Sequence, residues 1–490
     1  MPSGICVTTE SAYRGAPANA GALFLWYNTH MDYFLNIPNK VDKILRMLTR
    51  AGFDAYVVGG CVRDILMGRK PDDWDITTSA TPDETKACFE GYKVIETGIR
   101  HGTVTILMDG EPYEITTFRS DGAYTDGRHP DSVSFSKDIK VDLARRDFTM
   151  NALAYSPSKG LIDEYGGLSD IKNRIIKAVG VPEERFGEDS LRILRAIRFA
   201  GTLGFLLEPS TARAVRELAG TAGRASAERI MTEINKLLMG AYAAYAIKQY
   251  RTEINDAISF SGARIVDKKA VKALEHAPAS LPLRLALVLD VPDEGKQMNM
   301  FSWFTESSWF GFSQETDITG FREALRKMKY DNDTIKRAVQ IKELSVKDIT
   351  PDEIVVLLEM RKLADSFDPA EVPDMLIDGI SVRSLKGKLS DSATEKIFEI
   401  IAGITESGKC YSRAQLDITG DDLLNDSVMS GNNITGSGEE SDAADKAGLK
   451  PGKDVGRVLS ALLDEVIAGE TPNEHDALIE RARKIYTLLT

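Results

Sequence analysis

The 490-residue sequence has few cysteines and histidines and no long apolar run. Its cysteines form no C-x-x-C pair, which excludes a disulfide scaffold and a zinc finger and favours a reducing, cytoplasmic location. They are Cys6, Cys61, Cys88 and Cys410. None of the five histidines is spaced as a metal pair with another. No stretch of about 18 or more apolar residues occurs, so the sequence predicts no transmembrane helix and no membrane partner.

The sequence also has no excess of lysine and arginine over aspartate and glutamate, and its formal net charge is −13. This acidity argues against a protein that coats nucleic acid non-specifically. It leaves room for a local basic groove, because nucleic acid responds to the charge of the face that it meets. The length predicts about three domains at roughly 150 residues each.

The first thirty residues carry one basic residue, Arg14, and one short apolar stretch, residues 22–27. A secretory signal has a more basic start and a longer apolar core. We expect residues 1–30 to be a disordered tail or, as we favour, a stretch upstream of a true start at Met31. Beyond it, a helix is predicted by apolar residues three and four positions apart, namely Val41, Ile44, Leu45 and Leu48.

Short β-rich runs dominate residues 51–154, with Gly, Asp and Pro between them. The runs are Ala55–Val58, Thr103–Leu107, Tyr113–Phe118 and Ser132–Phe135. From about Glu183 onward the pattern is helical. A stretch at residues 425–447, rich in Ser, Gly, Asn and Asp, predicts an exposed, mobile insertion. The predicted fold class is α+β, with a mixed-sheet head followed by an all-helical remainder.

A Gly-Gly turn and a carboxylate pair stand close together in the head. A predicted strand ends in Gly59-Gly60 and a helix follows with Arg63 in its first turn, an arrangement that suits a phosphate. Asp73 and Asp75 follow in a strand-like context, where residues i and i+2 point to one face. Two converging carboxylates suit divalent cations such as Mg²⁺. An Asp-x-Asp alone is more often a solvated turn, but together these residues favour a metal site.

A third carboxylate, Glu114, lies in the run Tyr113–Phe118. It can join the pair from a neighbouring strand as a further catalytic residue. The polar face of an alternating strand explains it equally well, so both interpretations stay open.

The block Gly59-Gly60, Arg63-Asp64 and Asp73-Trp-Asp75 resembles the nucleotidyltransferase signature, in the form used by the class II tRNA nucleotidyltransferase/poly(A) polymerase family. Four further segments are similar to motifs of this family and follow in the family's order. They are Asp126–Pro130 for the flexible loop, Arg145–Ala152 for ribose selection, Glu188–Phe199 for nucleotide templating and Ser226–Ile230 for the neck. The segments 416–423 and 448–453 resemble the family's tail.

The resemblance implies roles for the matching residues. Asp73 and Asp75 are expected to be catalytic and to bind the metal, and residues 126–128 to form the flexible loop that helps the pocket change from C to A, namely Asp126, Gly127 and Arg128. The expected nucleotide-binding residues are Gly59, Gly60, Arg63, Arg146, Asp147, Asn151, Asp189, Arg192, Arg195 and Arg198. Among these, Arg146 is expected at a phosphate, Asp147 at the ribose hydroxyls, and Arg195 and Arg198 at the triphosphate. A local ion pair is the alternative for Arg146 and Asp147.

The templating segment also has a physical argument. In one continuous helix Asp189, Arg192, Arg195 and Arg198 form a slanted stripe, because residues three apart are neighbours. Cytosine and adenine each present an amino donor beside a ring-nitrogen acceptor, which an Asp beside an Arg complements. Guanine and uracil present the reverse pattern. A surface ion-pair ladder is the alternative.

The resemblance implies template-independent addition of CCA to the 3′ end of tRNA from CTP and ATP. The reaction transfers a nucleotide to the RNA 3′-hydroxyl with release of pyrophosphate, and two Mg²⁺ ions are expected as cofactors. The tRNA acceptor and elbow region is the expected partner, with Lys450 and Lys453 as candidate contacts, and no protein partner is inferred. The alternatives are an enzyme that adds only A, a poly(A) polymerase, a phosphohydrolase and a non-catalytic RNA-binding relative. No histidine precedes Asp290 as a phosphohydrolase requires, and the acidic C-terminal third argues against a poly(A) polymerase.

The family's layout predicts five parts along the chain. They are an extension at residues 1–30, a catalytic head at 31–180, a templating neck at 181–275, a helical body at 276–410 and a tRNA-binding tail at 411–490.

Overall fold

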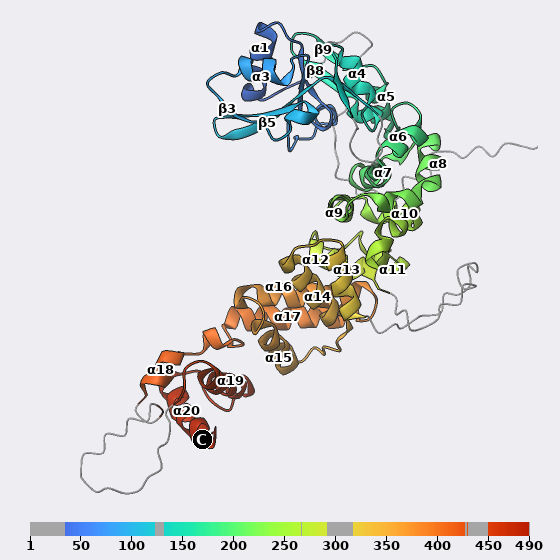
Figure 1. Cartoon of the computed structure of the whole chain (residues 1–490). Coiled ribbons are helices and arrows are strands. Elements are labelled where there is room, and N and C mark those ends of the chain that lie inside the picture. Colours follow the sequence, from blue (N-terminus) through green and yellow to red (C-terminus); the bar gives the residue numbers. More distant parts are fainter. Residues whose placement is uncertain are drawn as a thin grey trace, which may run out of the picture. The chain divides into compact units, whose positions relative to one another are not determined.

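The computed structural model describes residues 35–122, 132–265, 267–291, 317–426, 429 and 449–489 (Figure 1). The contacts within the chain divide it into two compact units, Met1–Ala225 and Ser226–Thr490. This division falls inside the range 181–275 that the sequence assigns to the neck. The five-part division stays a prediction, and so does the assignment of residues 1–30, which lie outside the described residues.

A mixed sheet lies at the centre of the first unit. Within the described residues it has seven strands in the order β3-β4-β5-β2-β1-β8-β9. β2 runs parallel to β5, and all other neighbouring pairs are antiparallel. The strands are β1 Ala55–Val58, β2 Ile76–Thr78, β3 Lys93–Ile95, β4 Thr103–Met108, β5 Glu111–Thr117, β8 Leu153–Ser156 and β9 Gly160–Asp163. The sheet confirms the predicted mixed-sheet head.

A separate two-stranded ribbon stands beside this sheet. β7 (Val133–Phe135), which the sequence predicts as a strand, pairs antiparallel with β6 (Arg119–Asp121). The chain leaves the large sheet at Phe118, whose backbone N–H donates to Thr78 O over 2.8 Å. The ribbon therefore brackets residues 123–131, which contain the expected flexible loop. Asp126, Gly127 and Arg128 lie outside the described residues.

The helices of the first unit follow from their apolar spacing and their caps. α1 buries the four residues that predict it, Val41, Ile44, Leu45 and Leu48, and so confirms that prediction. α3 begins with a capping box in which Thr81 and Glu84 bond reciprocally. The helices are α1 Asn39–Arg50, α2 Gly60–Leu66, α3 Pro82–Cys88, α4 Ile139–Ala144, α5 Gly167–Asn173, α6 Pro182–Glu188, α7 Leu191–Leu203 and α8 Pro209–Glu217. Short elements complete the unit: η2 Ile99–His101, η3 Thr149–Asn151, η4 Ala219–Arg224, β10 Ile175–Ile176 and β11 Leu206–Leu207.

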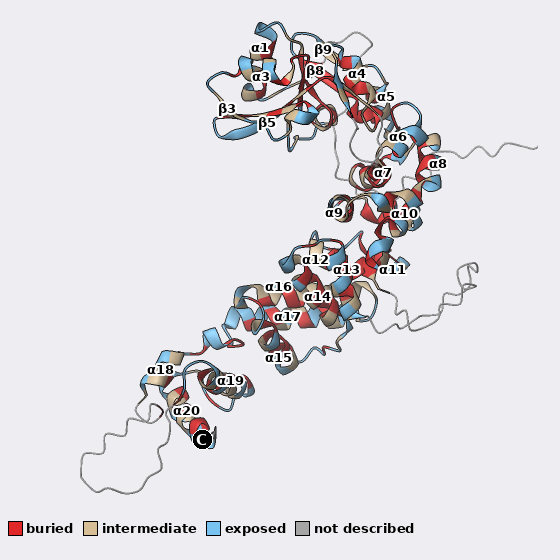
Figure 2. Cartoon of the chain, in the orientation of Figure 1, coloured by how far each residue is buried: buried red, intermediate tan, exposed pale blue. Residues whose placement is uncertain are grey.

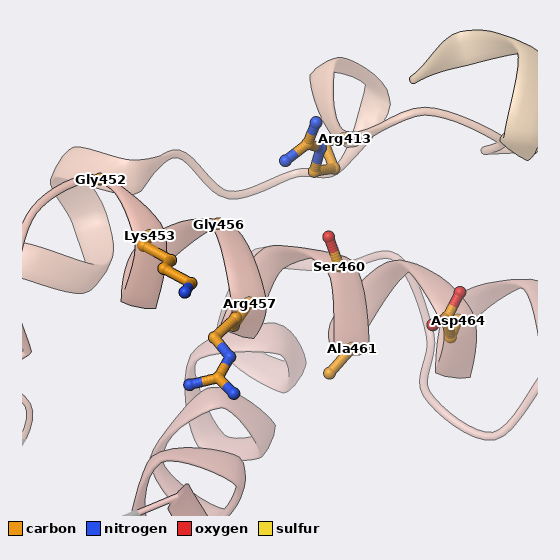
Figure 3. Close-up of a pocket in the computed structure, with 8 residues that line it drawn as sticks. All are labelled: Arg413, Gly452, Lys453, Gly456, Arg457, Ser460, Ala461 and Asp464. Carbon is orange, nitrogen blue, oxygen red and sulfur yellow. The ribbon is translucent and has the colours of Figure 1, made fainter. Parts of the chain in front are cut away.

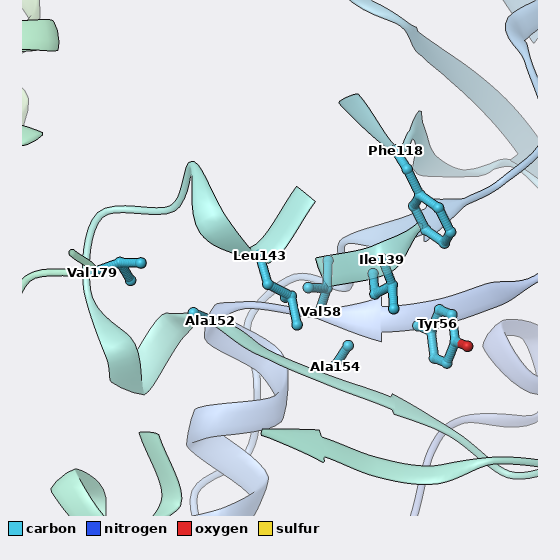
Figure 4. Packing of buried hydrophobic residues seen from close by; sticks show 8 residues of the cluster. All are labelled: Tyr56, Val58, Phe118, Ile139, Leu143, Ala152, Ala154 and Val179. Atoms are coloured by element: carbon cyan, nitrogen blue, oxygen red, sulfur yellow. The ribbon is translucent and has the colours of Figure 1, made fainter. Parts of the chain in front are cut away.

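The core of the head packs β1 and β8 against α4 (Figure 4). Tyr56 and Val58 from β1 meet Ile139 and Leu143 from α4 in one cluster, with Phe118 beside them. All four residues of β1 are buried, because the strand is covered on both faces. Each large apolar side chain buried in this way contributes roughly 1.5–3 kcal/mol. The end of β1 is therefore fixed by the core, and it positions the turn at Gly59 that follows.

The second unit is helical apart from one two-residue strand pair, β12 Arg264–Ile265 with β13 Leu289–Asp290, among the residues described. α14 packs against α12, α13 and α16. The helices are α9 Ala227–Leu238, α10 Ala243–Ile258, α11 Lys268–Ala273, α12 Leu281–Val288, α13 Ile318–Lys327, α14 Asn332–Val346, α15 Glu353–Ala364, α16 Val372–Leu385, α17 Asp391–Ser407, α18 Gly420–Asn425, α19 Lys453–Ala468 and α20 His475–Leu489. The predicted insertion at 425–447 falls almost entirely outside the described residues.

Buried residues lie along the inner strands of the large sheet, β4, β5, β2, β1 and β8, and on many of the helices (Figure 2). Proline stands in the first turn of α8, α12 and α16, where the missing N–H costs nothing. None of the described helices is both long and apolar enough to cross a membrane.

Candidate active site

The turn after β1 requires glycine. Gly59 has φ +82° and ψ −131°, a conformation that L residues rarely adopt. A Cβ atom added there would lie 2.9 Å from Arg146 Nη1 and 3.8 Å from Asp75 Oδ2. The bare backbone at Gly59 thus lets an arginine and a carboxylate approach each other, and α2 begins at the next residue.

The carboxylate pair lies directly before β2. Neither Asp73 nor Asp75 belongs to a strand, because pairing in β2 begins only at Ile76, so the predicted strand-like context is wrong. The carbonyl of Asp75 still accepts a hydrogen bond from Val58 N–H over 3.0 Å, which fixes the segment against the end of β1.

Glu114 stands next to this pair, on the neighbouring strand as predicted. Ile76 of β2 is in register with Ile115 of β5, and the two strands are parallel. Glu114 therefore occupies the position beside Asp75. Its catalytic role stays a prediction.

The surroundings of Asp75 concentrate negative charge. Partial desolvation by the protein, followed by the charges of Asp73 and Glu114, raises the pKa of Asp75. The guanidinium of Arg146 acts in the opposite direction. Asp75 remains solvent-exposed, so a cation can reach it. A divalent cation would relieve the repulsion between these carboxylates.

The donor set fits a magnesium ion that is shared with a substrate. The described part of the chain contains no group of three or more His, Cys, Asp and Glu side chains arranged to hold a metal ion. Mg²⁺ is commonly bound by one or two carboxylates together with water and substrate phosphates. Asp73 and Asp75 supply that number of ligands.

Arg146 is anchored by a buried carboxylate that the sequence analysis missed. Asp142 on α4 is fully buried, and its Oδ2 accepts from Arg146 Nη2 over 3.2 Å. Its Oδ1 accepts from Arg145 Nη2 over 2.7 Å. Burial alone would raise the pKa of Asp142, but the charges of Arg146 and Arg145 hold this pKa below its usual range. The signal was the i, i+3 and i, i+4 spacing from Asp142 to the two arginines.

Asp147 is surrounded by donors. Its Oδ1 accepts from Phe148 N–H over 2.8 Å and from Asn151 Nδ2 over 3.0 Å. Its Oδ2 accepts from Arg195 Nε and Nη2 over 2.9 and 2.8 Å. Burial opposes ionisation, but the charge of Arg195 and the bond from Asn151 hold the pKa of Asp147 far below its usual range. The carboxylate stays ionised and oriented.

Arg63 extends this network into the head. Its Nη1 donates to Asn151 Oδ1 over 2.7 Å, and its Nε and Nη2 donate to Asp64 over 2.9 Å each. Arg63 is almost fully buried. Its donors therefore orient Asn151 within the protein, and through Asn151 they orient Asp147.

The expected four-residue stripe is interrupted. Asp189 lies between α6 and α7 with φ −142° and ψ 103°, so it is extended and not helical. Its Oδ1 accepts from Leu191 N–H over 3.1 Å, a local bond by which Asp side chains end or begin helices. The continuous helix through Asp189 is therefore wrong, whereas Arg192, Arg195 and Arg198 do lie on α7. The backbone N–H of Arg192 donates to Asp189 O over 3.0 Å, so the two residues remain neighbours.

The guanidinium of Arg192 is held by its surroundings. Nη1 donates to Glu188 Oε2 over 2.5 Å and to Arg185 O over 2.9 Å. Nη2 donates to Arg145 O over 3.2 Å. The ion-pair interpretation thus describes part of this helix, and it leaves the templating role of Arg192 as a prediction.

Phe199 is the second residue that the sequence analysis missed. Its ring is buried on α7, and the guanidinium of Arg198 stacks on it at 3.6 Å from the centroid. The guanidinium groups of Arg63 and Arg195 lie 5.0 and 5.5 Å from the same centroid.

A basic hollow lies in the second unit, where α19 begins (Figure 3). It is open, has a volume of about 620 Å³ and is lined by Arg413, Gly452, Lys453, Gly456, Arg457, Ser460, Ala461 and Asp464. Lys453 and Arg457 are exposed and, among the described residues, neither has an ion-pair partner. Small residues one helical turn apart leave the backbone of α19 open between these cations. Of the two lysines expected at tRNA, Lys453 lines the hollow and Lys450 does not.

Two family models match the chain. The Poly A polymerase head domain matches residues 55–177, and the probable RNA and SrmB-binding site of polymerase A matches residues 204–253. The first range contains the glycine turn, the carboxylates and the Arg63–Asn151–Asp147 network.

Curated relatives of this chain are named CCA-adding enzyme. The CCA-adding enzyme of Lactiplantibacillus plantarum is 33% identical over 443 residues, which cover 90% of this chain and 95% of the relative. The structure of the Bacillus stearothermophilus CCA-adding enzyme in complex with CTP has a TM-score of 0.65 and 28% identity, covering 91% of this chain and 98% of that one. The Thermotoga maritima CCA-adding enzyme complexed with tRNA shares the fold, with a TM-score of 0.56, 20% identity and coverage of 92% and 95%.

Proposed function

The chain belongs to the family of CCA-adding enzymes, and we propose that it adds CCA to the 3′ end of tRNA from CTP and ATP without a nucleic-acid template. The observation that carries the proposal is one unit in which Asp75, with the charge of Asp73 acting on it, lies at Gly59. The arginine-bearing helix α7 is joined to the same turn through Asp147 and Asn151. The relatives' names favour this reaction over a poly(A) polymerase.

Asp73 and Asp75 are the proposed ligands of two Mg²⁺ ions, and Glu114 adds negative charge beside them. When bound, these ions would activate the RNA 3′-hydroxyl and neutralise charge on the α-phosphate and on pyrophosphate. The raised pKa of Asp75 is consistent with a site built to receive positive charge. Arg146, at Gly59, is placed to hold a phosphate against the bare backbone.

The base and the sugar are read by different residues. Asp189 and Arg192, at the start of α7, are the proposed pair that accepts C and A and rejects G and U. Asp147 is the proposed acceptor for the ribose hydroxyls. Its four lone-pair positions already receive four protein donors, so a ribose hydroxyl must displace one of them.

The tRNA is held by the second unit, and the hollow at α19 is the proposed contact to its phosphates. Exposed Lys453 and Arg457 beside small residues suit a phosphate backbone, which is recognised by charge and shape. We assign the enzyme to the cytoplasm, as the scattered cysteines predict. The described cysteines, Cys61, Cys88 and Cys410, are free thiols.

The test uses three tRNA transcripts, ending before CCA, after C and after CC, with Mg²⁺ and with CTP, ATP or both. Addition of C, C and A to the shortest transcript, read by product mass, is the expected result. A single A on the CC-ended transcript alone would make the protein an A-adding enzyme. Long A tails, or no product with any transcript, would refute the proposal.

A further inference from the structure

We propose that Phe199 is a positioning residue for the nucleotide: its buried ring holds the guanidinium groups of Arg195 and Arg198 where the triphosphate binds. This inference rests on the proposed function and extends it to a residue with no polar group of its own.

Three guanidinium groups lie near the ring. The guanidinium carbon of Arg198 lies 3.6 Å from the ring centroid, which is stacking distance, and those of Arg63 and Arg195 lie at 5.0 and 5.5 Å. All three are within the roughly 6 Å over which a cation is attracted to an aromatic face.

The ring itself is fixed. Phe199 is 3% exposed and packs edge-on against Phe148, with centroids 5.7 Å apart and an interplanar angle of 85°. The backbone N–H of Phe148 donates to Asp147, which in turn binds Arg195. The aromatic pair and the carboxylate network therefore stabilise the same arrangement.

A helix alone does not orient these arginines. Each arginine carries about 2 kcal/mol of side-chain rotamer entropy, so a long exposed guanidinium samples many positions. Phe199 lies four residues after Arg195, so the two side chains share one face of α7. The guanidinium of Arg198, the preceding residue, reaches the same ring. Stacking on the ring restricts the guanidinium plane of Arg198, and the ring together with Asp147 restricts that of Arg195. Both groups are therefore oriented before the nucleotide arrives, which lowers the entropy lost on binding.

The charges around the ring suit a polyanion. Three like charges near one ring repel one another. Asp64 compensates Arg63 and Asp147 compensates Arg195. Phosphate groups bind such planar donors bidentately. A triphosphate, which carries two phosphate groups beyond the α-phosphate, would therefore gain more from the arginines around Phe199 than a monophosphate.

The decisive variant is Phe199→Leu, which keeps an apolar side chain but removes the aromatic face. The matched control is Phe205→Leu, because Phe205 is an equally buried ring of the same unit with no stacked guanidinium among the described residues. Affinities for ATP, ADP and AMP are measured by calorimetry with Mg²⁺ and without tRNA, and melting temperatures are recorded for both variants.

We expect Phe199→Leu to bind ATP about tenfold more weakly while its affinity for AMP changes less than about twofold. The control should change ATP and AMP binding equally or not at all. An unchanged ATP affinity, or equal losses for ATP and AMP, would overturn the proposal. If Phe199→Leu does not fold, Phe199→Met repeats the measurement with a side chain that fills irregular space better. Absence of CCA addition by the wild type would refute the proposed function. A loss of affinity for ATP but not for AMP in Phe199→Leu would still support the positioning role of Phe199.

Discussion

At the scale of single residues, the site depends on a glycine without a side chain and on a carboxylate whose oxygens already accept hydrogen bonds from the protein. Gly59 matters because of what it lacks, since its bare Cα admits Arg146 and Asp75. Asp147 matters because its oxygens are filled by Arg195, Asn151 and a backbone N–H. In both cases, residues that are far apart in the sequence meet in the folded head: Arg146 at Gly59, and Arg195 at Asp147.

Gly59→Ala tests the first feature. The added methyl group meets Arg146 Nη1 at 2.9 Å in a strained conformation, so we expect kcat/KM for CTP and ATP to fall by about a hundredfold or more. Gly52→Ala is the control, because Gly52 has φ +89° but open space around its Cα. Both variants should lose similar stability, about 1–2 kcal/mol. Equal activity of the two variants in steady-state kinetics would contradict this reading of Gly59.

Asn151→Ala tests the second feature. The change removes one donor from Asp147 and leaves a buried N–H of Arg63 without its acceptor. We expect the preference for ATP over dATP, as a ratio of kcat/KM values, to fall by about tenfold. Asn173→Ala, which removes an exposed bond to Ser169, should leave this ratio unchanged. A general loss of activity with an intact ratio would show that Asn151 has no part in sugar selection.

At the scale of elements, much of the head could be predicted from the sequence. Alternating β-rich runs and the apolar spacing before residue 50 gave β1, β4, β5, β7 and α1, because local periodicity controls these elements. The break between α6 and α7 was missed, because the Asp189 side chain competes for a backbone N–H that a continuous helix would use. The ion pair between Asp147 and Arg195 was missed because the two residues are 48 positions apart in the sequence and meet only through the fold. The ring of Phe199 gave no signal, since a buried aromatic on a helix is normally core.

The hollow at α19 gives a prediction for a single element. Lys453→Gln with Arg457→Gln should raise KM for tRNA severalfold and leave KM for CTP unchanged, because we propose that these side chains contact the polynucleotide and not the nucleotide. Each lost phosphate contact should reduce the slope of log affinity against log salt by about 0.9. Lys484→Gln, an exposed cation on α20 paired with Glu480, is the control and should change neither value. An unaltered salt slope in the double variant would exclude this hollow as the tRNA contact.

At the scale of the whole molecule, the chain forms two compact units, and the second contains a buried lysine that links its elements. Lys342 on α14 is fully buried and donates to Ala286 O, Leu289 O and Asp290 Oδ1 over 2.8, 2.6 and 2.6 Å. Asp290, which the sequence analysis weighed as a phosphohydrolase residue, is therefore paired with a lysine. Through these hydrogen bonds Lys342 links α14 to α12 and β13.

Lys342 makes stability depend on pH. Burial lowers the pKa of Lys342 to about 8, although Asp290 opposes the shift. Between pH 8 and about 10.4 the unfolded chain holds a proton that the folded chain has released, so the contribution of Lys342 to stability rises with pH. Relative to Lys342→Met, the wild type should gain up to about 1.4 kcal/mol of unfolding free energy per pH unit in this window. Urea unfolding measures the difference, with exposed Lys336→Met as the control, and a flat difference would contradict the assignment.

The central claim is that the protein itself selects C, C and A at one site. The most direct measurement offers a tRNA that lacks CCA all four nucleoside triphosphates at equal concentration and sequences the products. We expect CCA alone from the wild type, no product from Asp73→Asn, and incorporation of U or G by Asp189→Ala. Misincorporation by the wild type, or unchanged selection by Asp189→Ala, would contradict it.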